Sequence, residues 1–186
     1  MDAFVRLQLA SLIALVVWPA AAVGQPAREP ADSAALRFVR GFYAWYVPAQ
    51  ARSHERGVEL VLKHRGSALG DELRRALVQD SVAQARAKGE IDGLDFDPFL
   101  NSQDPCDSYA ARRVRRDGDG FAVEIYGTCR VKKDARPDVV VELAPRATSW
   151  VIRNIKYSDH SDLLGQLRLL HGAPKHTPPS GHLTSH

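Results

Sequence analysis

Two cysteines are the residues of this sequence whose spacing indicates defined chemistry. Cys106 and Cys129 stand on two segments joined through Asp117-Gly118, a dipeptide typical of tight hairpin turns. A two-residue turn there pairs Arg116 with Asp119 and, counted outward along both strands, Cys106 with Cys129. We therefore predict a disulfide, which closes a loop of about 23 residues and contributes on the order of 3 kcal/mol. The alternative is a pair of free buried thiols.

A second candidate is the acidic segment 92–107, which carries five aspartates between a predicted helix and a predicted sheet. Its spacing lacks the glycine and glutamate of a calcium loop, so we predict no metal and no cofactor. Asp-Gly and Asp-Pro pairs are also common in turns, which leaves a purely structural interpretation open. If the segment binds a ligand or a partner, the candidate residues are Asp95, Asp97, Gln103 and Asp104.

Two further charged residues fall at positions that are expected to be apolar. Asp80 lies on the same helical stripe as Leu73 and Leu77, so it is either solvated at an edge or buried with a partner. The predicted hairpin register places Arg112 opposite Val123, on the inward face. Arg112 then either reaches the sheet edge, pairs with a carboxylate such as Asp80, or binds an anionic ligand.

No motif for nucleophilic catalysis and no glycine-rich phosphate loop is present. His54, His64 and His160 are isolated, and we expect each of them at the surface. Four more histidines lie in or beside the C-terminal tail, at spacings that do not form a preorganised metal site. We therefore list no catalytic residue.

Helical periodicity covers the chain before the acidic segment. Leu36, Val39, Tyr43 and Tyr46 recur at spacings of three and four, and Pro48 is expected to end this helix. Its wide aromatic face is typical of a core, with an aromatic-lined ligand cavity as the alternative. Two more helices are predicted, over 58–63 and 67–88.

From residue 106 the apolar period changes to two, which indicates strands. We predict strands over 108–116, 121–131, 139–143 and 149–157, followed by a final helix that Ser161 or Asp162 caps. The predicted fold class is α+β, with N-terminal helices packed on a curved antiparallel sheet of about four strands and a C-terminal helix.

The ends of the chain differ in character from this domain. Residues 9–18 form an apolar run of about ten residues, too short to cross a bilayer, and small residues follow it. We predict a signal peptide over 1–24, cleavage before Gln25, a single domain over 25–171 and a disordered tail over 172–186. The mature protein is then expected in the periplasm or outside the cell, without stable membrane insertion.

Composition excludes several classes of function. The 186 residues include 25 Lys and Arg and 22 Asp and Glu, a net charge of +3. Nucleic-acid binding calls for a clustered basic face, which this mixed charge does not provide. With 45% hydrophobic residues, the chain can build a core and is not disordered as a whole.

Two stretches resemble a group of small exported bacterial proteins of unknown function. These are the residues 38–46, with the sequence FVRGFYAWY, and 95–104, with the sequence DFDPFLNSQD. The group is similar in layout to the cone-shaped fold of the nuclear transport factor two and cystatin-like superfamily. The resemblance implies a pocket at the mouth of the cone, with Asp97, Gln103 and Asp104 as the matching polar positions. Such folds serve many functions, so the resemblance does not select one.

Three hypotheses remain open at this stage. The first is a non-catalytic periplasmic domain that binds a small molecule or a protein through the pocket or the acidic segment. The second is a small isomerase or dehydratase with Asp80 or Asp97 as the general base. The third is an immunity protein that inserts the acidic segment into a secreted toxin.

Overall fold

A computed structural model describes residues 29–87, 92–129 and 136–172. The predicted signal peptide and nearly all of the predicted tail lie outside these residues. The elements in chain order are α1 Ala31–Arg52, α2 Gly57–Arg65, the short 3₁₀ helix η1 Gly66–Ala68, α3 Asp71–Arg86, β1 Ser108–Asp117, β2 Gly120–Thr128, β3 Val139–Arg146, β4 Ser149–Tyr157 and α4 Leu163–Gly172.

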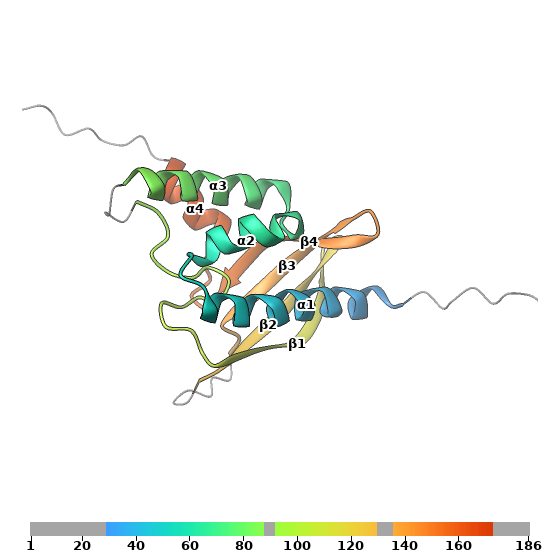
Figure 1. The fold of residues 1–186 in the computed structure, drawn as a ribbon. Helices are drawn as coiled ribbons and strands as arrows, with labels where there is room; N and C mark the ends of the chain where they lie inside the picture. Colours follow the sequence, from blue (N-terminus) through green and yellow to red (C-terminus); the bar gives the residue numbers. More distant parts are fainter. Residues whose placement is uncertain (1–28, 88–91, 130–135, 173–186) are drawn as a thin grey trace, which may run out of the picture.

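The four strands form one open antiparallel sheet in the order β1-β2-β3-β4. Helix α1 crosses β1 and β2, while α3 and α4 lie against β4 at the other edge (Figure 1). Helix α2 connects the two groups of helices. The predicted α+β class, with helices before the sheet and one helix after it, is confirmed.

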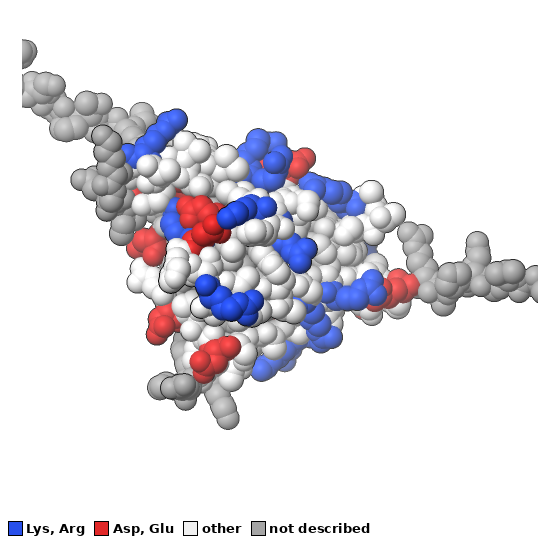
Figure 2. All heavy atoms as spheres, viewed as in Figure 1, with Lys and Arg blue, Asp and Glu red and all other residues white. Residues whose placement is uncertain are grey.

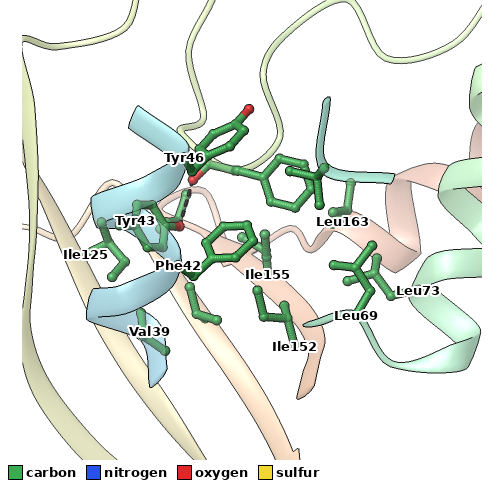
Figure 3. Close-up of a cluster of buried hydrophobic side chains, with 14 of the residues drawn as sticks. Val39, Phe42, Tyr43, Tyr46, Leu69, Leu73, Ile125, Ile152, Ile155 and Leu163 are labelled. Carbon is green, nitrogen blue, oxygen red and sulfur yellow. Dashed lines mark hydrogen bonds between the residues drawn. The ribbon is translucent and has the colours of Figure 1, made fainter. Parts of the chain in front are cut away.

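A single apolar core lies between the helices and one face of the sheet. Alternating strand residues such as Val123, Ile125 and Val141 supply one side, as a sheet with one buried face requires. Figure 3 shows how the helices supply the other side, with Val39, Phe42, Tyr43 and Tyr46 of α1 close to Ile125, Ile152 and Ile155 of the sheet and to Leu69, Leu73 and Leu163.

The prediction that Pro48 ends the first helix is wrong, because α1 continues to Arg52 with Pro48 inside it. A proline within a helix removes only one backbone hydrogen bond, the one its own nitrogen would donate. The buried side chains of Tyr43 and Tyr46, five and two residues earlier, anchor this part of the helix. The extra turn places Gln50 beside the acidic segment.

The predicted register of the first hairpin is also wrong. The two turn residues are Gly118 and Asp119, since Asp117 pairs with Gly120. Val114, rather than Arg112, lies opposite Val123, and an irregularity between Ala111 and Val114 shifts the pairing by one residue. Such a β-bulge redirects side chains.

The bulge places Arg112 on the surface instead of the core. Its guanidinium lies over the ring of Tyr126, with 4.8 Å between Cζ and the ring centroid. Arg112 therefore neither points inward nor pairs with Asp80, and the structure does not bring it to the acidic segment.

Cys106 and Cys129 nevertheless form the predicted disulfide, with 4.6 Å between their Cα atoms. Both cysteines lie just beyond the last paired residues, Ser108 and Thr128, so the error in register does not separate them. The bond ties the end of the acidic segment to the end of β2.

Removing this bond is expected to lower the free energy of unfolding by about 3 kcal/mol, because the unfolded chain regains the freedom of a loop of 23 residues. Urea unfolding of the Cys106→Ala, Cys129→Ala double variant measures the loss. A reducing agent added to the unchanged chain should produce the same loss and none in the variant. Equal midpoints with and without reductant would contradict the prediction.

Candidate functional site

A cavity of about 390 Å³ lies where the end of α1, the start of α2 and the acidic segment meet. It contains three of the residues that the sequence singled out, Asp95, Asp97 and Gln103. The rest of its wall consists of Gln50, Arg56, Gly57, Val58, Gln84, Leu94, Phe96, Ser102 and Pro105. We call it the polar cavity.

Asp97 is the anchor of this region. Its Oδ2 accepts a hydrogen bond of 2.6 Å from the hydroxyl of Tyr46, on α1. Its Oδ1 accepts the backbone N–H groups of Phe99, at 2.9 Å, and Leu100, at 3.2 Å. An aspartate that bonds the backbone two and three residues further on stabilises a turn, so Asp97 both shapes the acidic segment and attaches it to α1.

Burial is the main influence on this pair. It raises the pKa of Asp97, and the three hydrogen bonds that the carboxylate accepts offset only part of that rise. Burial also raises the pKa of Tyr46 far above its ordinary value, and the neighbouring Asp97 adds to the shift. Tyr46 therefore stays protonated and acts as the donor.

Two more tyrosines attach the same segment to the core. The Tyr43 hydroxyl donates to the carbonyl of Phe99 at 2.8 Å, and the Tyr157 hydroxyl donates to the carbonyl of Pro98 at 3.1 Å. Asp97 and Ser102 exchange backbone hydrogen bonds across the turn. Residues 97–102 thus form a fixed wall of the polar cavity.

Asp80 is completely buried, in agreement with the second of the two predicted alternatives. Its partners are Arg56, with Nη2 at 3.4 Å from Oδ2, and His171, with Nε2 at 3.0 Å from Oδ1. The backbone N–H of Leu94 also donates to Oδ1, at 3.0 Å. Asp80 therefore joins α3, α4 and the acidic segment.

Arg56 connects this buried group to the cavity. Its guanidinium donates to the carbonyl of Leu94 at 2.9 Å and to the carboxylate of Glu59 at 3.2 Å, besides approaching Asp80. Asp80 does not line the polar cavity, whereas Arg56 does. His171 belongs to the last turn of α4 rather than to the tail.

Two glycines permit these close approaches. A Cβ on Gly57 would collide with the Tyr46 hydroxyl and lie 2.9 Å from Asp97 Oδ2. A Cβ on Gly93, whose φ is +156°, would lie 2.5 Å from Asp80 Oδ1. A side chain at Gly57 would therefore displace the Asp97 carboxylate, and one at Gly93 would displace that of Asp80.

The remaining predicted residues are distributed unevenly. Asp95 and Gln103 lie at the rim of the cavity, where Gln103 Nε2 donates to the carbonyl of Asp95 at 3.2 Å. Asp104 is exposed and outside the cavity wall, although its backbone N–H donates to Ser102 Oγ. Arg112 lies on β1 and is not part of this wall.

The sequence interpretation missed Gln50 and Arg56. Gln50 Oε1 is buried in the wall of the polar cavity and accepts no hydrogen bond from any residue that the structure describes. Gln50 was missed because the helix was expected to end before it. The position of Asp80 on a buried helix face could have led to the search for Arg56, because a buried carboxylate requires a cation or several donors nearby.

The described parts of the chain show no preformed metal centre, because no three His, Cys, Asp or Glu side chains among them converge. Among those same residues, no helix is long and apolar enough to cross a membrane. Comparison of the chain with protein-family models, with curated proteins and with solved structures found no match.

Proposed function

We propose that this protein is an exported binding domain whose polar cavity takes a small ligand with a protonated amine or another N–H donor. The observation that carries the proposal is Gln50 Oε1, a buried acceptor in the cavity wall without a partner among the described residues. A buried carbonyl without a donor costs free energy, which a bound donor would recover.

The other groups of the wall favour the same class of ligand. The cation, Arg56, already donates to Leu94, Glu59 and Asp80, and Gln103 donates to Asp95. The acidic groups of the wall are the carboxylates of Asp95 and Asp97. Because Arg56 is already paired and the wall carries two carboxylates against this one cation, the cavity favours a cationic ligand over an anion.

The surroundings of Asp97 and Asp80, the two candidate bases, fit a role in binding better than a role in catalysis. A general base must present a lone pair to the substrate. Both oxygens of Asp97 accept hydrogen bonds from within the protein, and Asp80 lies outside the cavity wall with partners of its own. We infer that both carboxylates hold the wall in place.

Export remains part of the proposal. The apolar run and the small residues that follow it support a signal peptide, and a disulfide is typical of oxidising compartments such as the periplasm. The arrangement of helices on one face of an antiparallel sheet supports kinship with the nuclear transport factor two and cystatin-like superfamily.

Calorimetric titration of the full chain with n-butylammonium and with butyrate tests the cavity. The two probes have the same apolar chain and opposite charges. We expect the cation to bind with a dissociation constant on the order of 1 mM, and butyrate to bind at least about tenfold more weakly.

Two variants make this test specific for the cavity. Gln50→Met removes the acceptor while keeping the length of the side chain, and it should weaken n-butylammonium binding roughly tenfold. Gln79→Met, at an exposed position of α3 outside the polar cavity, should leave it unchanged. An unchanged affinity for n-butylammonium in Gln50→Met, or an equal loss in Gln50→Met and Gln79→Met, would refute the proposal.

A further inference from the structure

A second pair of cavities lies on the other side of α2. The first, of about 550 Å³, lies between α2, η1 and the start of α3, and the second, of about 410 Å³, lies between α1, η1 and the β3–β4 hairpin. Both are lined by Ser67 and Arg146, so they are adjacent parts of one groove. We call them the basic cavity and the aromatic cavity.

Cations dominate the walls of this groove. Lys63, Arg74 and Arg146 line the basic cavity and Arg65 lines the aromatic one, against the single carboxylate of Asp71. Figure 2 shows the same separation of charge, with blue side chains gathered over the half of this face toward the β3–β4 hairpin and most red ones over the other half. The groove therefore has the opposite polarity to the polar cavity.

Arg74 has no partner for its charge among the described residues. Lys63 pairs with Glu55 at 2.6 Å, and Arg146 pairs with Asp71 at 3.0 Å. The guanidinium of Arg74 forms neither an ion pair nor a hydrogen bond with residues 29–87, 92–129 or 136–172. An anion in the basic cavity would supply the missing counter-charge.

Arg146 holds the junction of the two cavities in place. Its guanidinium donates to the carbonyls of Ser67, at 3.2 Å, and Leu69, at 3.4 Å, besides its contact with Asp71. These contacts attach the β3–β4 hairpin to the turn that precedes α3. The floor between the cavities is thus formed by elements that are fixed to each other.

The aromatic cavity provides an apolar wall next to this charge. Phe38 and Trp150 are half-buried in it, and Trp150 meets Phe121 edge to face, with 5.3 Å between ring centroids. Gly41 leaves space there, because a Cβ built on it meets no atom within 4 Å. Aromatic walls and open volume suit the apolar part of a small ligand.

We propose that this groove binds a small amphipathic anion, a carboxylate or phosphate on a single apolar chain. The anionic group lies near Arg74 in the basic cavity, and the chain extends past Ser67 and Arg146 into the aromatic cavity. A nucleic acid fits less well, because the cations line a hollow beside aromatic rings rather than an extended stripe.

Calorimetric titration of the full chain with octyl phosphate, octanoate, octyl glucoside and inorganic phosphate, each below its micellar concentration, tests the proposal. We expect the two octyl anions to bind at least about tenfold more tightly than the two other probes. The stronger of the two anions distinguishes a phosphate-bearing from a carboxylate-bearing ligand. Equal binding of octyl phosphate and octyl glucoside, which has the same chain without a charge, would overturn the proposal.

Two variants locate the binding. Arg74→Gln should weaken octyl phosphate binding roughly tenfold, whereas Arg75→Gln, the same change one residue later and outside the groove, should not. Gly41→Leu should fill the aromatic cavity and abolish binding of the octyl chain, without lowering the urea midpoint, since leucine favours a helix more than glycine does.

An unchanged affinity for octyl phosphate in either Arg74→Gln or Gly41→Leu would overturn the assignment of the groove. Binding of n-butylammonium in the polar cavity should be the same in both variants. The two sites can therefore fail independently of each other.

Discussion

Replacing Asp97 by alanine is expected to lower the free energy of unfolding by on the order of 4 kcal/mol. The change leaves three donors without their acceptor, namely the Tyr46 hydroxyl and the backbone N–H groups of Phe99 and Leu100. All three lie in the buried part of the fold. Urea unfolding, followed by far-ultraviolet circular dichroism, measures the loss.

Asp95→Ala is the matched control, because Asp95 lies two residues away in the same segment but is exposed. We expect its cost to stay below about 1 kcal/mol. Comparable losses in the two variants would show that Asp97 does not anchor the segment.

The pH dependence of stability gives a further check on the same residue. Burial raises the pKa of Asp97 in the folded state, so its protonated form is favoured by folding. The stability that this proton contributes is complete below the unfolded pKa and is lost as the pH rises through the higher folded value. In the Asp97→Asn variant this loss should be absent, so its stability relative to the unchanged chain should increase with pH over that window.

The second large effect is expected from Asp80→Ala, at about 3 to 5 kcal/mol. Removing this buried carboxylate takes away one of the three partners of the Arg56 guanidinium, and it leaves His171 and the N–H of Leu94 without their acceptor. The expected loss is large because three separate elements meet at this one side chain.

Asp71→Ala, the same substitution on the same helix, serves as the control for Asp80. Asp71 pairs with Arg146 near the surface, and such pairs contribute about 1 kcal/mol or less. If Asp80→Ala were no more costly than Asp71→Ala in urea unfolding, the buried cluster would not hold α3 and α4 to the acidic segment.

Local sequence patterns, namely apolar periodicity and helix capping, were enough to predict most elements of the fold. Alternation in β2 and the stripe of α3 predicted which residues face the core, including the position of Asp80 on the buried face. Asp162 was predicted as a possible cap of the final helix, and its Oδ1 accepts the N–H of Gly165 at 2.8 Å. Periodicity and capping act over a few residues, which is why one sequence suffices for them.

The contacts between distant segments were harder to predict. The turn lies one residue later than predicted and β1 carries a bulge, so counting from the turn placed Arg112 in the wrong position. The disulfide was predicted correctly because it lies outside the ladder, where a shift of one residue matters little. The partners of Asp80, Arg56 and His171, lie 24 residues before it and 91 residues after it and carry no local signal.

The residues of the polar cavity were predicted in part and missed in part. Asp95, Asp97 and Gln103 were predicted together because they share one short segment. Gln50 was missed because a rule for proline that holds for most helices fails for α1. The last turn of α1, which the prediction left out of the helix, thus brings Gln50 into the observed site.

The central claim, that the polar cavity binds an amine through Gln50, is tested most directly by nuclear magnetic resonance. The full chain, labelled with ¹⁵N, is titrated with n-butylammonium while the side-chain amide signals of its glutamines are recorded. We expect the signals of Gln50 and Gln103 to shift together and to saturate, while that of Gln79, outside the cavity, stays in place. Signals of Gln50 and Gln103 that do not move at saturating n-butylammonium would contradict the claim.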